Sequence, residues 1–591
     1  MQCQRRLRNF LIQEKIEVVH AHSRAAVRIA HGACKNLPTV LVSTIHGQQH
    51  LSFGKKFFDH YGERVLAVCE ELAIHLERDF GMNPKKIRVL RNPVPLPTNP
   101  QKSPPTSHLR IGFIGRRSGP KGENTLRLLL NTILPLCAER AMNSSAERAM
   151  NPSAERANEA NAERAIEFLI TGGPAEAWPQ ELHEQIAEVQ KLHPEIQFSF
   201  RDHLNLDEEM NSLAVVVGAG RVAISALQKG IPVLAFGEAR WEGLVQPNNW
   251  AQVLRTNFGD IAAEKSPFAD PQFWQHLKAD FRPLFSLPSR GEDVAAPVFA
   301  ERWTDSDRRA LQTLSQNEFS TEKIVQGVWQ TYLEAREEKH LRGAIPILMY
   351  HKVVIETPNT KHKIFVHRDL FKKHLTWLEK QGKKTLSFQT LSAFKDGRLS
   401  SWEFPEKPVI LTFDDGYLNN LEYAVPLLQK HRMTATFYLL ADPRITSNSW
   451  DWTKDPSEPR FELLDPAGRQ ALVQAGMEIG SHGFRHEDIT TKSLSDAELE
   501  VGNSKSQLEK ELGTPVLSYA YTFGRRREDL DSALRLAGYE FAVNTDSGAL
   551  SSRENWFSLF RVNIFPHDGY FSFRKKTSPK YRQKFYRKRG R

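Results

Sequence analysis

The sequence predicts an α/β protein made of several domains, each built around a mainly parallel β-sheet. Its 591 residues are too many for one hydrophobic core. Short β-branched runs alternate with helix-like stretches along most of the chain, as they do in βα units. Apolar residues make up 40% of the chain and charged residues 25%, close to the average for globular proteins. We therefore expect folded domains throughout.

The spacing of the cysteines and the hydropathy of the chain indicate where in the cell the protein is located. All four cysteines lie in the first quarter of the chain without CxxC spacing, which argues against a disulfide framework or a cysteine zinc site. No stretch approaches the roughly 20 apolar residues of a membrane span, and the first residues lead into no signal-peptide core. We expect a cytoplasmic protein, with peripheral attachment to the inner membrane left open.

The formal charge of +10 is concentrated at one end of the chain. Residues 571–591 form a basic tail with ten Lys or Arg and no acidic residue, so the rest of the chain is close to neutral and no nucleic-acid partner is expected. Two interpretations of the tail remain. It is either a solvated segment or an attachment to an anionic membrane surface, where each basic residue contributes about 1 kcal/mol.

The first two domains are expected at residues 1–97 and 108–340, joined by a segment rich in proline and polar residues. An octad beginning AERA recurs four times within 138–165 and predicts a surface insertion with no catalytic role. The strands expected in these domains are β-branched runs, at 16–19, 40–44, 64–67 and 87–90, then at 109–114, 166–170, 214–217 and 232–236.

The third domain is expected at residues 345–570, after an amphipathic helix at about 321–338. Its strand-like runs lie at 346–351, 409–413, 435–440, 478–480, 517–521 and 541–544. Helices are expected between them, at 369–381, 420–431, 465–475, 496–512 and 528–537.

Two carboxylates follow a buried-looking strand in this domain. The run Val409 to Phe413 ends at Asp414, Asp415 and Gly416. Parallel strands of α/β folds carry their active sites at this end, and the glycine allows the chain to turn sharply. Taken alone, this Asp-Asp-Gly triplet is either a solvated turn or a turn that carries two catalytic carboxylates.

Two histidines follow a later strand end. His482 and His486 are four residues apart, so they can face the same side of one helical turn and present two imidazoles to a metal. Two histidines and one carboxylate make a three-ligand site with open positions for water and substrate, and the second carboxylate is then free to act as a base.

These motifs resemble those of a known family. YHKV at Tyr350, TFDDG at Thr412 and SHGFRH at Ser481 are similar to the NodB homology domain of the polysaccharide deacetylases, carbohydrate esterase family four. The resemblance implies that Asp414 is the general base and that Asp415, His482 and His486 hold a divalent metal, usually zinc. It also implies an N-acetylated glycan substrate and a distorted (β/α) barrel with fewer than eight regular units.

The resemblance suggests further site residues. Ala520 to Gly524 reads AYTFG, with threonine where proline is common, and assigns Tyr521, Phe523 and Gly524 to the wall of the substrate groove. Arg561, in the segment LFRVNI, resembles another motif and is assigned to substrate binding. His567 is either the acid that protonates the leaving amine or an ordinary surface histidine, because its surroundings differ from the family's Leu-x-His.

The first half resembles glycosyltransferase family four. VVHAHSR at Val18 and STIHG at Ser43 are similar to the family's N-terminal domain, and IGFIGR at Ile111 and the segment from Gly218 are similar to its nucleotide-sugar domain. Two Rossmann-like domains of the GT-B type are implied. Arg116 and Lys121, near a helix N-terminus, would then hold the diphosphate of a nucleotide sugar.

Two departures count against a fully active transferase. The family's first strand and its glycine-rich loop should precede Val18 and are absent, so we expect the first domain to be incomplete. Ser225 stands where the family has an acidic residue that binds the donor ribose. The first half is therefore either a nucleotide-sugar site or a retained scaffold.

Together these features predict a bacterial enzyme that removes N-acetyl groups from an amino sugar in a polysaccharide or glycan precursor, fused to a glycosyltransferase-like module. Two alternatives stay open. The chain is otherwise a sugar transferase with a secondary deacetylase domain, or a non-catalytic glycan-binding remnant.

Overall fold

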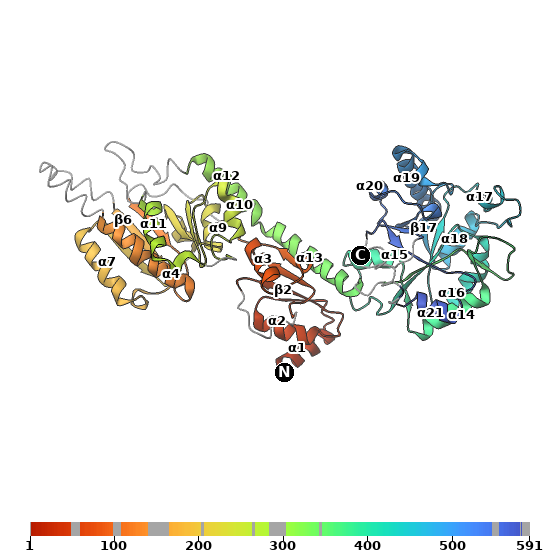
Figure 1. Ribbon diagram of the computed structural model, residues 1–591, viewed down its shortest axis with the longest axis horizontal. Helices are drawn as coiled ribbons and strands as arrows, with labels where there is room; N and C mark the ends of the chain where they lie inside the picture. The colour runs from red at the N-terminus through yellow and green to blue at the C-terminus, as the bar shows by residue number, and fades with distance from the viewer. Residues whose placement is uncertain are drawn as a thin grey trace. The chain divides into compact units, whose positions relative to one another are not determined.

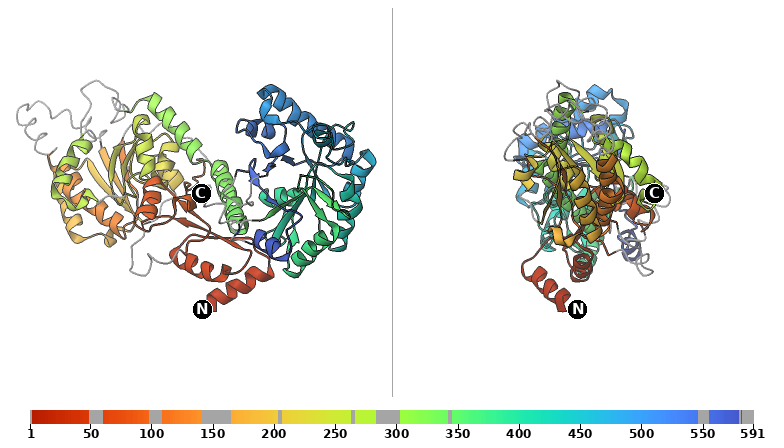
Figure 2. Two further views of the ribbon diagram at one scale, coloured as in Figure 1. Left: turned by 45° about the vertical axis from the view of Figure 1, so that its right-hand side comes forward. Right: turned by 90° about the vertical axis from the view of Figure 1, so that its left-hand side faces the viewer.

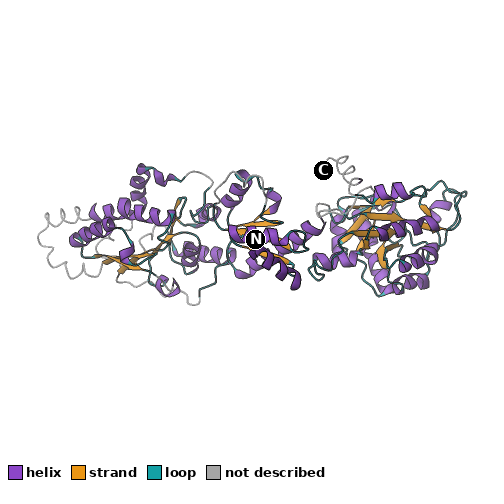
Figure 3. Cartoon of the chain, turned by 90° about the horizontal axis from the view of Figure 1, so that it is seen from below, coloured by secondary structure: helices purple, strands orange, loops and turns teal. Residues whose placement is uncertain are grey.

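The computed structural model describes residues 2–48, 60–97, 108–139, 165–202, 206–262, 266–282, 303–341, 345–545, 555–578 and 581. The chain divides into two compact units. Most of the first unit is Leu41–Tyr332, and most of the second is Leu333–Arg591. Strands and helices alternate in both units (Figures 1 and 3), which confirms the predicted α/β class. The finer domain boundaries at 97, 108, 340, 345 and 570 stay predictions.

The first sheet of unit 1 has the order β1-β2-β3-β4. Its strands are β1 (Val18–Ala21), β2 (Val40–Ile45), β3 (Arg64–Ala67) and β4 (Ile87–Val89). The pairs β2/β3 and β3/β4 are parallel. The helices that alternate with these strands are α1 (Gln2–Gln13), α2 (Arg24–Cys34) and α3 (Glu70–Arg78).

The second sheet of unit 1 has the order β10-β9-β8-β5-β6-β7. Its strands are β5 (His108–Phe113), β6 (Ala165–Thr171), β7 (Ile196–Arg201), β8 (Val215–Gly218), β9 (Val233–Phe236) and β10 (Trp241–Leu244), which runs antiparallel to β9. Its helices include α4 (Pro120–Leu128), α7 (Gln180–Leu192), α9 (Arg221–Gln228) and α12 (Asp305–Glu318). The strand order reverses between β5 and β8, where α/β sheets place their ligands.

Each strand expected in the first half overlaps an observed one, whereas β7 and β10 were not predicted. In β7 the sequence IQFSFR alternates apolar and polar residues, the pattern of a half-buried strand, so the signal was present and was overlooked. The amphipathic helix expected at 321–338 is α13 (Thr321–Leu341). Most of the octad insertion, residues 140–164, lies outside the described residues.

The sheet of unit 2 is a nearly closed parallel barrel with the order β20-β19-β18-β17-β16-β15-β11-β21. Every neighbouring pair on this path is parallel. The strands are β11 (Ile347–Tyr350), β15 (Pro408–Phe413), β16 (Thr436–Leu439), β17 (Glu478–Ser481), β18 (Ser518–Ala520), β19 (Phe541–Asn544), β20 (Leu559–Phe560) and β21 (Val562–Asn563).

Helices surround this barrel (Figure 2, left). They include α14 (Arg368–Lys380), α15 (Phe388–Lys395), α16 (Val425–Lys430), α18 (Pro466–Gln474), α19 (Leu494–Leu512), α20 (Leu530–Leu536) and α21 (Tyr570–Lys576). Val409 to Phe413 of β15 are all buried, as expected for a parallel strand covered on both faces. The expected fold class is thereby confirmed.

The barrel lacks eight regular units because its last two strands have no helix between them. β20 and β21 occupy the two ends of the strand order, yet only Arg561 separates them in the sequence. At Arg561 the chain therefore crosses from one edge of the nearly closed sheet to the other.

Among the described helices, none is both long and apolar enough to cross a membrane.

Candidate active site

Polar residues gather where the barrel strands end. Because all strands on the path are parallel, their carboxyl ends lie at one rim of the barrel. His351 follows β11, Asp414 and Asp415 follow β15, and His482 follows β17. This rim is where (β/α) barrels carry their chemistry.

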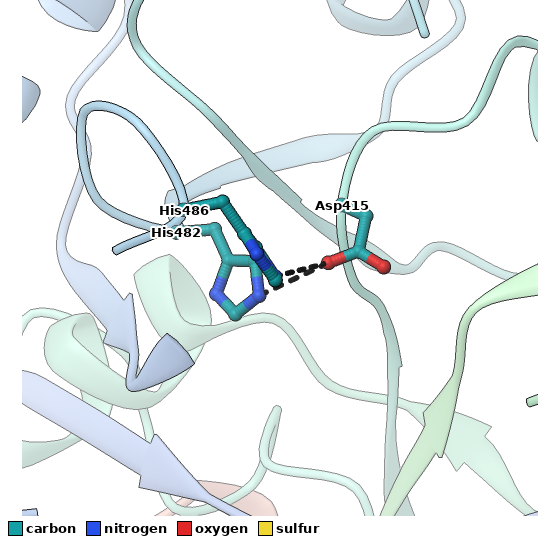
Figure 4. Close-up of side chains that lie close together, drawn as sticks. All are labelled: Asp415, His482 and His486. Carbon is teal, nitrogen blue, oxygen red and sulfur yellow. Dashed lines mark ion pairs between the residues drawn. The ribbon is translucent and has the colours of Figure 1, made fainter. Parts of the chain in front are cut away.

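Asp415, His482 and His486 converge on one point (Figure 4). Asp415 Oδ1 lies 3.1 Å from His482 Nε2 and 3.3 Å from His486 Nε2. All three side chains are buried, and their ligand-type atoms lie within 4.8 Å of one another. Two imidazole nitrogens and one carboxylate oxygen at this spacing are the donor set of a divalent transition metal with open positions.

A backbone carbonyl orients His482, and aromatic side chains hold His486. His482 Nδ1 donates to the Ala520 carbonyl at 2.8 Å, which leaves Nε2 as the nitrogen that faces Asp415. The His486 ring lies between two aromatic rings: Trp450 stacks on it at 4.0 Å, and Phe523 meets it edge-on at 4.7 Å. Trp450, on α17 (Ser449–Trp452), was not singled out in the sequence.

The expectation that His482 and His486 share a helical turn is wrong. The segment after β17 is a loop, in which Gly483 has φ +84° and His486 has φ +56°. These left-handed residues reverse the chain so that both imidazoles reach Asp415. Asp415 itself has φ +71°, a costly conformation for a non-glycine residue that tends to persist at functional sites.

Asp414 lies beside this cluster and is held by Arg561. Arg561 Nη1 donates to Asp414 Oδ1 at 2.5 Å, and Nη2 donates to Oδ2 at 2.7 Å. Burial alone raises the pKa of Asp414, but the Arg561 guanidinium and the nearby histidines hold this pKa below its usual value. Asp414 is therefore a carboxylate at neutral pH.

Arg561, assigned to substrate binding from the sequence, is fully buried. Its Nε also donates to the Asn544 carbonyl at 3.0 Å. Its hydrogen bonds therefore hold Asp414 and the end of β19.

His351 is a site residue that the sequence reasoning left without a role. His351 Nε2 lies 3.9 Å from Asp414 Oδ2, and its side chain is 15% exposed. Burial lowers the pKa of His351, while Asp414 and Asp415 act in the opposite direction. This histidine belongs to the YHKV motif. Its position at the end of a strand-like run was the signal in the sequence that could have identified it as a site residue.

His567, the acid candidate from the sequence, is exposed. Its ring stacks on Phe565 at 5.6 Å. Among the described contacts of His567, none involves Asp414 or the three clustered residues.

The residues assigned to the groove wall differ in their exposure to solvent. Tyr521 is buried, and its hydroxyl donates to the Phe557 carbonyl at 3.0 Å. Phe523 is 47% exposed and Gly524 follows it with φ +66°. Phe523 and His486 line a cavity of about 550 Å³, whose other lining residues are Lys454, Glu487, Asp488, Thr491, Lys492 and Arg525. This cavity opens beside the histidine cluster and is large enough for a sugar unit.

Unit 1 contains a second cavity, of about 660 Å³, at the switch point of its second sheet. Arg116 and Lys121 both line it, as does the start of helix α9 at Gly220 and Arg221. Lys121 Nζ is paired with Asp260 Oδ1 at 2.8 Å. Ser225 lies on α9 but is not one of the lining residues.

Comparisons with known proteins agree with this geometry. Residues 402–542 match the family model for polysaccharide deacetylase, and residues 1–97 match the model for Glycosyltransferase Family 4. YxkH of Bacillus subtilis, named as a polysaccharide deacetylase, is 27% identical over 224 residues, which are 38% of this chain and 72% of YxkH.

Two further relatives belong to the same class. Poly-beta-1,6-N-acetyl-D-glucosamine N-deacetylase of Staphylococcus aureus is 22% identical over 211 residues, covering 34% of this chain and 67% of that protein. The structure of the Streptococcus pyogenes deacetylase PplD is 26% identical, with a TM-score of 0.34, and covers 40% of this chain and 99% of that one.

The C-terminal unit is thus a hydrolase of the deacetylase class, acting on N-acetyl groups. The whole chain joins a polysaccharide deacetylase domain to a glycosyltransferase-like domain.

Proposed function

We propose that the C-terminal domain hydrolyses the N-acetyl group of an amino sugar in a polysaccharide or glycan precursor, with a divalent metal held by Asp415, His482 and His486. The observation that carries this proposal is the convergence of these side chains beside Asp414. When bound, such a metal acts as a Lewis acid and lowers the pKa of its water towards about 7. Zinc is the metal we expect, because the donors are mainly imidazole.

The chain's own residues move the protons. Asp414 takes the proton from the attacking water, because it is a buried carboxylate beside the cluster. Arg561 fixes the orientation of this base through two hydrogen bonds. As the water oxygen bonds to the acetyl carbon and the carbon–nitrogen bond breaks, the leaving amine needs a proton.

We assign that proton to His351 rather than to His567. His351 lies 3.9 Å from Asp414 and is largely buried, whereas His567 is exposed and contacts none of the clustered residues. A general acid must reach the leaving group directly or through one water. Because burial lowers the pKa of His351, its ring starts neutral. It takes up the proton that Asp414 has removed from the water and passes this proton to the leaving amine.

Phe523 and the cavity beside His486 support binding of the sugar. Exposed aromatic rings at a polar cavity present an apolar face to a sugar ring. Acetate release from N-acetylhexosamine glycans, measured with and without a chelator, tests the proposed function. Chelator-sensitive release supports it. Glycan binding without acetate release would indicate the non-catalytic alternative instead.

For the first half we propose weak nucleotide-sugar binding at the second cavity. Arg116 and Lys121 line it beside the N-terminus of α9, a favourable place for a diphosphate. Asp260 already pairs with Lys121, and Ser225 offers no carboxylate to a ribose. Calorimetry with nucleotide sugars and an Arg116→Ala control tests binding, and efficient sugar transfer would favour the glycosyltransferase alternative.

We also propose that the basic tail binds an anionic membrane surface. Residues 579–580 and 582–591 lie outside the described residues. Just before them, α21 exposes Tyr570 and Phe571, at 56% and 82%, and aromatic rings favour the membrane interface. Removing residues 577–591 should reduce binding to phosphatidylserine vesicles while leaving activity on a soluble glycan intact, and equal binding would indicate a solvated tail.

A further inference from the structure

A carboxylate holds one of the basic side chains that line the cavity of unit 1. Four basic and two acidic residues line this cavity, which has a volume of about 660 Å³. Asp260 is one of the acidic residues, and its Oδ1 lies 2.8 Å from Lys121 Nζ. The side chains of Lys121 and Asp260 are only 16% and 24% exposed. Salt screens a partly buried pair less than an exposed one, so Asp260 keeps Lys121 occupied.

The second oxygen of Asp260 lies at the start of helix α9. Gly220 precedes this helix with φ +56° and supplies no side-chain cap. A Cβ built on Gly220 would lie 2.9 Å from Asp260 Oδ2, so the carboxylate stands directly against the glycine. The Asp260 carboxylate therefore lies between a lysine ammonium and the N-terminus of a helix, where a phosphate group of a ligand would bind.

Arg116 differs from Lys121 in its freedom to bind a ligand. Both residues line the cavity, but Arg116 is exposed and makes no ion pair within the part of the chain that the structure describes. An incoming diphosphate can therefore meet Arg116 at once. It can reach Lys121 only by replacing the carboxylate that already neutralises this lysine.

We propose that Asp260 is an internal competitor of the diphosphate, which sets the affinity of the cavity by occupying Lys121. This inference rests on the proposed nucleotide-sugar site. The apparent affinity of a ligand falls with the fraction of protein that is competent to bind it, and the Asp260 carboxylate also repels an incoming anion. The weak binding that we propose for this half then has its cause in one side chain.

The direct test is the affinity of the 591-residue protein for inorganic pyrophosphate, measured by calorimetry at low salt without added zinc. Pyrophosphate presents the diphosphate group alone, so the result does not depend on which nucleotide base the site prefers. Asp260→Asn keeps the shape of the side chain and removes its charge. We expect this variant to bind pyrophosphate about 10-fold more tightly than wild type. Equal or weaker binding would overturn the inference.

Asp202→Asn is the matched control, because Asp202 is an exposed acidic residue that lines the same cavity. This variant removes an equal charge but leaves Lys121 paired with Asp260, so its gain in affinity should be clearly smaller. A gain as large as that of Asp260→Asn would show that the total charge of the cavity sets the affinity, and the role proposed for Asp260 would be wrong.

Lys121→Met separates competition from simple repulsion. In this background Asp260→Asn should add little affinity, because no lysine remains to be released. The same gain of about 10-fold with and without Lys121 would show that Asp260 acts by repulsion alone, which contradicts the proposal. Pyrophosphate binding that is unchanged in Arg116→Ala, or absent from both wild type and Asp260→Asn, would instead refute the nucleotide-sugar site itself.

Discussion

The Arg561 guanidinium holds the Asp414 carboxylate with two parallel hydrogen bonds, both fully buried. The arginine reaches this position because it is the single residue between β20 and β21, where the barrel almost closes. Closure of the barrel and orientation of the proposed base therefore depend on the same side chain.

We predict that Arg561→Lys lowers kcat by about 10²-fold while KM and zinc content change little. Lysine keeps the charge but cannot donate two parallel hydrogen bonds, and a displacement of about 1 Å in a catalytic group can cost this much. Steady-state kinetics together with metal analysis would measure the effect. A rise in KM at constant kcat would favour the substrate-binding role first expected for Arg561.

The two aspartates should differ when each is changed to asparagine. Asp414→Asn should retain the metal and lose about 10²- to 10⁴-fold in rate, because a positioned base is removed. Asp415→Asn should weaken metal binding, because a neutral amide oxygen is a poorer ligand than a carboxylate. Rates and metal content of both variants test this division, which fails if the two behave alike.

His351→Gln should slow deacetylation by about 10²-fold or more, since it removes the proposed acid near Asp414. His567→Gln serves as the matched control, because the exposed ring of His567 contacts no clustered residue. Acetate-release rates with zinc-saturated protein decide between them. A large loss in His567→Gln with little change in His351→Gln would reverse the assignment.

His374 should make the C-terminal domain less stable in mild acid. It stacks on Phe573 of α21 at 3.9 Å, and burial lowers its pKa from 6.5 to about 4. Between these values the unfolded chain binds a proton that the folded chain excludes. Its contribution to stability is therefore present above pH 6.5 and is lost as the pH falls towards 4, by at most about 1.4 kcal/mol per pH unit.

Urea unfolding at several pH values would measure this effect, with His374→Gln as the comparison. The variant should be less stable at neutral pH, because two hydrogen bonds of His374 change. It should also lose less stability between pH 6.5 and 4. Parallel pH curves for the two proteins would show that His374 is not responsible.

Much of the fold could be predicted from the sequence, because the buried strands leave strong local patterns. The segments around Val409 to Phe413 and Phe541 to Asn544 are short and mainly apolar, and both are strands. The short strands β20 and β21 were missed, since two residues carry no periodic signal.

Site residues could be predicted only where a ligand-type side chain directly follows a strand-like run in the sequence. Asp415, His482 and His486 stand out because ligand-type residues follow strand-like runs, and the structure brings them together. The contact between Arg561 and Asp414, 147 positions apart, depends on closure of the barrel. No local pattern encodes that closure, nor the left-handed loop that brings His486 to Asp415.

The metal content of the 591-residue protein tests the central claim most directly. We predict about one zinc per wild-type chain, loss of acetate release on chelation, and recovery when zinc is restored. The double variant His482→Ala/His486→Ala should bind no zinc under the same conditions, because it removes both imidazole ligands. Wild-type protein without metal that still releases acetate, or equal zinc loading in the double variant, would contradict the account.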